Sequence, residues 1–152
     1  MSKLSIFLAA PMSGFKDELQ YKKNRKNLIG FINKLNKKYI VYSEILHIQS
    51  MDSYEDPGQS AIKDFGEISR ADVFIMYHPM HMQTSTLIEL GYAVAKQKKI
   101  ILIAQPDMLP YLALGLSSYN PDIYIVPSSE LDRDVVNKVE SILNGFLDTR
   151  DI

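Results

Sequence analysis

The feature that most constrains this sequence is its alternation of short, continuously apolar runs with longer segments of helical spacing. Apolar runs bounded by turn residues predict strands over residues 4–10, 39–42, 72–77, 99–104 and 123–126. Apolar residues at helical spacing predict a helix after the first strand, where Leu28, Ile32 and Leu35 fall on one face. The same spacing predicts helices over 60–70, 86–96 and 128–147, and Pro, Gly, Asp and Ser predict a long loop over 44–59.

Strands that are apolar on both faces and alternate with helices are typical of a parallel sheet covered on both sides. The predicted fold class is therefore α/β: a flavodoxin-like (Rossmann-like) three-layer sandwich around a five-stranded parallel sheet. With 152 residues, the length is that of one domain, so a single domain is expected over residues 1–152. Ligands of such sheets bind at the carboxyl ends of the strands, which directs attention to the loops that follow them.

Composition excludes several classes of protein. The chain has no cysteine, which excludes disulfides, thiolate zinc sites and a cysteine nucleophile. No apolar run is long enough to cross a bilayer, and the amino terminus lacks the pattern of a signal peptide, so a cytoplasmic protein is expected. The net charge is −1, with a basic first quarter and an acidic middle, and this balance gives no indication of a nucleic-acid or membrane partner.

Glu89 is the first candidate for chemistry, because it begins a predicted helix after the third strand. A carboxylate there is favoured in its ionised form by the helix dipole and could attack an electrophilic sugar carbon. The structural alternative is a capping box, because Thr86 and Glu89 have the required spacing. Asp64, on the preceding predicted helix, is either a solvated surface residue or a carboxyl that protonates a leaving group.

The turn after the first strand, Pro11 to Gly14, is the second candidate. Its small residues, Ser13 among them, could present N–H groups to a phosphate, and Thr84 and Ser85 could add hydroxyls to the same anion. It matches neither known glycine-rich phosphate loop, so a plain turn is the alternative. His78 and His81 have the spacing of metal ligands, but a third ligand is missing, and no metal site is predicted.

Three sequence blocks in this order resemble the nucleoside 2-deoxyribosyltransferase family, which includes the related nucleoside 5′-monophosphate N-glycosidases. The resemblance covers about residues 4–126, and the block that starts at Glu89 is its most specific part. The blocks are Ile6-Phe7-Leu8-Ala9-Ala10-Pro11, Asp64-Phe65-Gly66-Glu67-Ile68 with the following Ala71-Asp72-Val73, and Glu89-Leu90-Gly91-Tyr92-Ala93.

The resemblance implies that Glu89 is the nucleophile that displaces the base, and that Asp64 contacts the base and helps it depart. It further implies no metal or organic cofactor, and a homo-oligomer in which Asn120 reaches the active site of a neighbouring subunit. The implied substrate-binding residues are Phe7, Ala9, Pro11, Ser13, Gly14, Gln83, Ser85 and Asn120.

Two positions depart from the transferases of this family. Phe7 stands where they often have a tyrosine that contacts the nucleophile, and Gln83 stands where they have a sugar-binding aspartate. We hypothesise that both changes leave room for a ribose 2′-hydroxyl. The hydroxyl-rich segment Thr84-Ser85-Thr86 is more similar to the phosphate-tolerant glycosidase branch.

The predicted function is therefore cleavage of the N-glycosidic bond of a nucleoside or nucleoside 5′-monophosphate through a glutamate nucleophile. The sugar would pass to another base, as in a transferase, or to water, as in an N-glycosidase. Two alternatives stay open: a hydrolase of a larger nucleotide such as a dinucleotide cofactor, and a non-catalytic nucleotide-binding sensor or effector domain.

Overall fold

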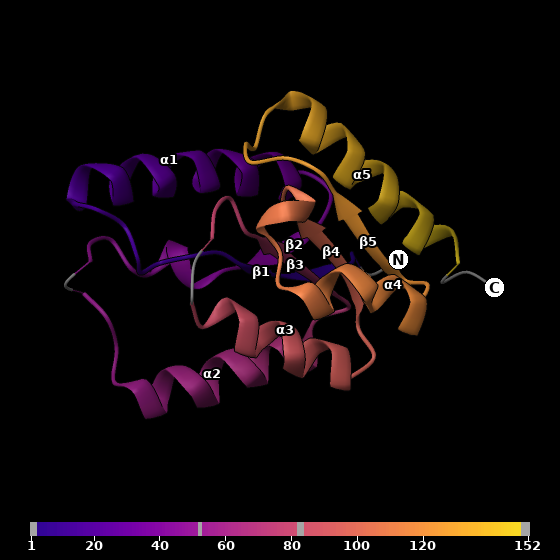
Figure 1. Ribbon diagram of the computed structural model, residues 1–152, viewed down its shortest axis with the longest axis horizontal. Coiled ribbons are helices and arrows are strands. Elements are labelled where there is room, and N and C mark those ends of the chain that lie inside the picture. The colour runs from indigo at the N-terminus through magenta and orange to yellow at the C-terminus, as the bar shows by residue number, and fades with distance from the viewer. Residues whose placement is uncertain (1–2, 52, 82–83, 150–152) are drawn as a thin grey trace.

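The strands of the protein form one parallel sheet in the order β2-β1-β3-β4-β5 (Figure 1). The computed structural model describes residues 3–51, 53–81 and 84–149. The strands are β1 (Ser5–Ala9), β2 (Ile40–Tyr42), β3 (Val73–Tyr77), β4 (Lys99–Ile103) and β5 (Ile123–Val126). The α-helices are α1 (Glu18–Leu35), α2 (Pro57–Arg70), α3 (Thr86–Ala95), α4 (Leu116–Tyr119) and α5 (Arg133–Asp148). Short 3-10 helices lie at Glu44–Leu46, Pro106–Met108 and Tyr111–Gly115.

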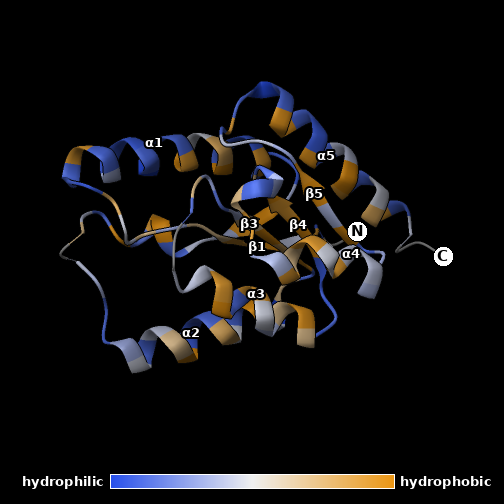
Figure 2. Cartoon of the chain, in the orientation of Figure 1, coloured by the Kyte–Doolittle hydropathy of each residue, from blue (hydrophilic) through white to orange (hydrophobic). Residues whose placement is uncertain are grey.

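Helices cover both faces of the sheet, α1 and α5 on one side and α2 and α3 on the other (Figure 1). Figure 2 shows that hydrophobic residues concentrate on the strands and on the helix surfaces that face them. The predicted flavodoxin-like α/β sandwich is therefore confirmed, including its five parallel strands. Because β1 and β3 are neighbours while the chain visits β2 between them, the order of the sheet reverses there. The loops that follow β1 and β3 separate at that point and leave room for a ligand.

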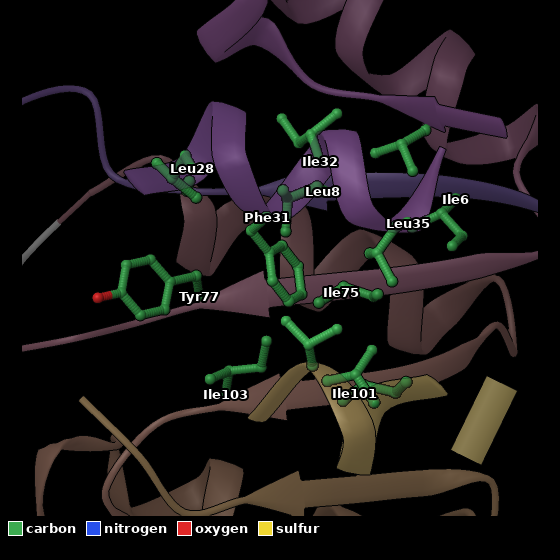
Figure 3. Close-up of a cluster of buried hydrophobic side chains, with 14 of the residues drawn as sticks. Ile6, Leu8, Leu28, Phe31, Ile32, Leu35, Ile75, Tyr77, Ile101 and Ile103 are labelled. Carbon is green, nitrogen blue, oxygen red and sulfur yellow. The ribbon is translucent and has the colours of Figure 1, made fainter. Parts of the chain in front are cut away.

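Two apolar clusters hold the layers together. In the larger one, Leu28, Phe31 and Leu35 of α1 pack on strand residues such as Ile75 and Ile101 (Figure 3). Burying each such side chain contributes about 1.5–3 kcal/mol, so this face anchors the sheet firmly. The smaller cluster lies under α2 and α3 and includes Ile68, Leu90 and Ala93. Both helices that flank the candidate site are thus fixed to the sheet by their apolar sides.

Helix boundaries are where the structure departs from the sequence prediction. Helix α2 begins at Pro57 rather than at residue 60, because Asp56 caps it by accepting a hydrogen bond from the Gln59 amide at 3.2 Å. Helix α5 begins at Arg133 rather than at 128, because Asp132 accepts from the Val135 amide at 3.0 Å. The long loop predicted over 44–59 is consequently shorter. Among the described residues, no helix is long and apolar enough to cross a membrane.

Candidate active site

A cavity of about 360 Å³ lies between the loop after β1, helix α2 and the start of helix α3. Its walls follow the carboxyl ends of β1, β2 and β3, which is the edge where ligands of parallel sheets bind. Its volume is near the lower end for ligand pockets. The lining residues are Ala10, Met12, Ser13, Glu44, Ile48, Tyr54, Glu55, Pro57, Ser60, Ala61, Asp64, Phe65, Thr84, Ser85, Thr86, Ile88 and Glu89.

Glu89 lies in the first part of α3 and lines this cavity. The residue that caps α3 is Ser85, which makes no side-chain capping hydrogen bond. Thr86 is already inside the helix, and its hydroxyl shares a 2.5 Å hydrogen bond with the hydroxyl of Thr84. The capping box that the Thr86–Glu89 spacing suggested is therefore not formed. The carboxyl group of Glu89 has no capping role and is available to a ligand.

The pKa of Glu89 is raised to about 8. Burial is the largest cause, and the negative charges of Asp64 and Glu44 add to it. The sequence-based expectation that the helix dipole keeps Glu89 ionised is therefore wrong, because burial and the neighbouring carboxyls outweigh the dipole. The dipole acts at the very end of the helix, whereas loss of solvent and two adjacent acidic groups act directly on the carboxyl. At pH 7 a carboxyl with this pKa is ionised in about one molecule in ten.

Asp64 brings a second carboxyl to the cavity from α2. Burial and the charge of Glu44 raise its pKa to about 7. Its Oδ1 atom is buried and makes no hydrogen bond within the described part of the chain. An unpartnered buried oxygen is tolerated more readily on a neutral acid than on a carboxylate. With this pKa about half of the Asp64 carboxyls hold a proton at pH 7, and a leaving-group acid must hold one.

Glu44 is a third carboxyl of the cavity, and sequence reasoning missed it. It lies in the 3-10 helix that follows β2 and is only 7% exposed. Its Oε1 accepts a 2.6 Å hydrogen bond from the Tyr42 hydroxyl and lies 3.1 Å from Lys63 Nζ. The Lys63 ammonium and these hydrogen bonds hold the pKa of Glu44 below its usual value despite burial. A glutamate just after a short strand carries no sequence signal, because only the fold brings Lys63 of α2 to it.

Hydroxyl groups form the rest of the polar wall. Ser13 follows β1, while Thr84, Ser85 and Thr86 precede or begin α3. The Tyr54 hydroxyl donates a hydrogen bond to the Met12 carbonyl and so ties the loop before α2 to the loop after β1. Ser13 and Ser85, both predicted from sequence, thus line one cavity with Glu89 and Asp64.

Other predicted substrate-binding residues are not among those that line the cavity. The Phe7 side chain is 1% exposed and stacks on Phe74 in the core, with ring centroids 5.8 Å apart. Asn120 is occupied locally, since its Oδ1 accepts a 2.9 Å hydrogen bond from the Asp122 amide. The remaining ones are Ala9, which is buried in the sheet, Pro11, whose carbonyl accepts from Asn24 at 3.3 Å, and Gly14, whose φ is 83°. Gln83 lies outside the described residues.

The position of Phe7 corrects part of its predicted role. Its ring also lies 5.6 Å from the ring of Tyr42, whose hydroxyl reaches Glu44. Phe7 thus supports a wall of the cavity from behind and is not a surface for the sugar. Whether the absence of a tyrosine hydroxyl at this position leaves room for a ribose 2′-hydroxyl stays a prediction.

The histidine pair gives no sign of a metal centre. His78 is buried at the end of β3, and burial lowers its pKa, whereas His81 is exposed. Over residues 3–51, 53–81 and 84–149, no group of three potential metal ligands lies close together.

Comparison with solved structures identifies proteins with the same architecture. A CMP N-glycosidase from Clostridium botulinum, BcmB, matches with a TM-score of 0.68 and 24% identity over 90% of this chain and 98% of that chain. The chain shares its fold with a CMP N-glycosidase. BlsM matches with a TM-score of 0.77 and 19% identity over 99% of this chain and 95% of that one. A conserved protein from Enterococcus faecalis V583 matches with a TM-score of 0.59 and 13% identity, over 92% and 99%.

These likenesses establish the fold at low sequence identity. No protein-family model matches the chain, and no curated protein matches its sequence. The CMP N-glycosidase among the neighbours agrees with the family resemblance described above, which includes N-glycosidases of nucleotides.

Proposed function

We propose that this protein cleaves the N-glycosidic bond of a nucleotide and belongs with the nucleoside 2-deoxyribosyltransferase-like N-glycosidases. The observation that carries the proposal is the placement of Glu89 and Asp64 from adjacent helices on one cavity at the carboxyl edge of the sheet. The CMP N-glycosidase with the same fold supports it. The cavity volume of about 360 Å³ favours a mononucleotide over a dinucleotide cofactor.

The two carboxyls perform complementary steps. The ionised Glu89 attacks the anomeric carbon and forms a carbon–oxygen bond, while the carbon–nitrogen bond breaks and its electron pair goes to the base. The proton of Asp64 passes to the base, which leaves as a neutral molecule. Asp64 is then a carboxylate. It accepts a proton from a water that attacks the same carbon, and Glu89 is released as a carboxylate.

A second base instead of water would complete a transferase reaction through the same intermediate. We infer that both outcomes use the same two residues, because they differ only in the second nucleophile. Chromatography of the protein with nucleosides and their 5′-monophosphates, with and without a second free base, tests the proposal. Free base alone indicates hydrolysis, and a new nucleoside indicates transfer. Absence of release from every substrate would contradict the proposed function.

A non-catalytic nucleotide sensor is the second candidate, because a pKa of about 8 leaves Glu89 mostly protonated at neutral pH. A neutral Glu89 binds without attacking. Calorimetric titration that shows nucleotide binding, in a protein that releases no base over hours, would favour the sensor. Release at pH 7.5 would favour the enzyme.

We propose that the hydroxyl-bearing residues of the cavity bind the 5′-phosphate; they are Ser13, Thr84, Ser85 and Thr86. Ser85 lies at the start of α3, where helix N–H groups and the helix dipole favour an anion. Within the described part of the chain, no lysine or arginine lines the cavity, so hydroxyl and N–H groups would have to bind the phosphate. We expect Ser85→Ala to raise the KM for a nucleoside 5′-monophosphate about tenfold, the cost of one hydrogen bond to a charged group. Steady-state kinetics with the unphosphorylated nucleoside is the internal control, and an equal effect on both substrates would contradict this role.

We propose that the protein forms a homo-oligomer through the segment that precedes Asn120. Tyr111 is 93% exposed, and Leu112, Leu114 and Tyr119 are also exposed on the same short helical segment. Apolar side chains gathered on one segment mark interaction surfaces. Asn120 directly follows this segment, and the family resemblance implies that it reaches the active site of a neighbouring subunit.

We expect Tyr111→Glu to shift the protein toward the monomer, because a charge cannot be buried at an apolar interface without a large desolvation cost. Sizing with light scattering measures the shift. Lys138→Glu on α5 is the control, because Lys138 is exposed and lies outside this segment. A wild-type protein that runs as a monomer would contradict the proposal.

A further inference from the structure

The ion-pair network behind Asp64 has no role in the two-carboxyl mechanism. Lys63 Nζ lies 3.1 Å from Glu44 Oε1 and 3.1 Å from Glu55 Oε1. The Tyr42 hydroxyl donates to the same Glu44 oxygen at 2.6 Å. Glu44 is nearly fully buried, yet it lines the cavity. Burying a carboxylate is costly unless it is paired and hydrogen-bonded, so this arrangement is built to keep one charge at one place.

Glu44 and Asp64 line the same cavity, and the negative charge of Glu44, after burial, raises the pKa of Asp64. Two adjacent carboxyls cannot both ionise readily, so the proton stays on whichever group is less stabilised as an anion. Glu44 has the Lys63 cation and the Tyr42 hydroxyl on its Oε1. Asp64 has a buried oxygen with no partner in the described structure. The proton therefore belongs to Asp64.

We propose that Glu44, fixed by Tyr42 and Lys63, is a positioning residue that stores the leaving-group proton on Asp64. This inference rests on the proposed function and assigns the proton source for base departure. Glu44 does not touch the reacting atoms in this scheme. Its negative charge acts on Asp64, and Lys63 sets how strongly it acts.

The same arrangement helps Asp64 to regain its proton after each turnover. When Asp64 gives its proton to the leaving base, two carboxylates face each other in a buried site. Their repulsion favours the uptake of a proton from the attacking water, which returns Asp64 to its starting state. The groups that act on Asp64 electrostatically are Glu44, Lys63, Glu55 and Glu89, from four different segments.

Titration of Asp64 by carboxyl carbon NMR tests the storage directly and does not depend on activity. In wild-type protein the midpoint is expected at about 7. Glu44→Gln removes the charge that holds the proton and should lower the midpoint by at least about one unit. Lys63→Met removes the cation that opposes Glu44 and should raise it. These opposite shifts distinguish an electrostatic role from general loosening of the fold, and a midpoint unchanged in both variants would overturn the proposal.

The leaving group provides the activity test. Glu44→Gln is expected to slow release of a natural base from its 5′-monophosphate about eightfold or more at pH 7.5, because a one-unit fall in the midpoint lowers the protonated fraction of Asp64 by that factor. A 4-nitrophenyl riboside 5′-phosphate releases a phenolate that needs no proton, so its cleavage should be affected far less. Glu130→Gln, an exposed carboxyl in the loop before α5, is the matched control. An equal loss on both substrates would overturn the role of Glu44, whereas no release by wild-type protein would contradict the proposed function itself.

Discussion

Glu89→Gln is expected to abolish base release, with kcat reduced by at least about a thousandfold. Glutamine has the shape of glutamate but is a far weaker nucleophile and cannot form the sugar ester. The substitution should not disturb the fold, because the Glu89 side chain caps no helix and makes no ion pair that the structure records. Substrate binding should persist, since most of the cavity wall is unchanged.

Chromatographic base release measures this loss, and calorimetry measures the retained binding. Glu130→Gln makes the same chemical change on an exposed loop and should keep wild-type activity. Intact-protein mass spectrometry of wild-type enzyme quenched during turnover should show the added sugar, and the Glu89→Gln protein should not. Residual activity within about tenfold of wild type would exclude Glu89 as the nucleophile and move the proposal to a direct attack by water.

The same substitution is expected to stabilise the protein at alkaline pH. The pKa of Glu89 rises from 4.5 to about 8 on folding, so the folded state holds a proton that the unfolded chain has already lost. Stability from this group is therefore present below about pH 4.5 and is lost as the pH rises through about 8. Glutamine does not titrate and escapes this loss. With a discount for partial exposure, the gain at pH 8 should be about 2–3 kcal/mol.

Urea unfolding at pH 5 and at pH 8 measures this difference. At pH 5 the Glu89→Gln and wild-type proteins should differ by less than about 1 kcal/mol, because that pH is only slightly above the unfolded-state pKa of 4.5 and little stability has yet been lost. Glu130→Gln should show no such dependence on pH. A gain of equal size at both pH values would mean that the substitution acts through packing, and a loss at pH 8 would mean that Glu89 is ionised in the folded protein.

The sheet could be predicted because its strands are buried on both faces and read as unbroken apolar runs. Helix starts were predicted less well, since they depend on which of several polar residues caps the helix. Asp56 and Asp132 settle this for α2 and α5 through hydrogen bonds that spacing does not specify. Likewise, Thr86 and Glu89 have the spacing of a capping box, yet the helix begins at Thr86 itself, one residue too early for Thr86 to be the cap.

Glu89 and Asp64 could be singled out from the sequence, because both lie in blocks that resemble a family of known chemistry and precede or follow predicted strands. That they share a cavity, and that the cavity raises the pKa of both, depends on residues distant in sequence. Phe7 shows the opposite case: its strand was predicted, but stacking against Phe74 places it behind the wall.

The sequence by itself determined the α/β architecture, the edge of the sheet where ligands are expected to bind and two of the four carboxyls that line the cavity there. Local apolar periodicity carries that information, because it decides which side of each element is buried. Only the tertiary structure decided the role of Glu44, since Lys63 and Tyr42 reach it from other elements. It also decided the protonation of Glu89 and Asp64, because desolvation and charge–charge interactions depend on distances in space and not on spacing along the chain.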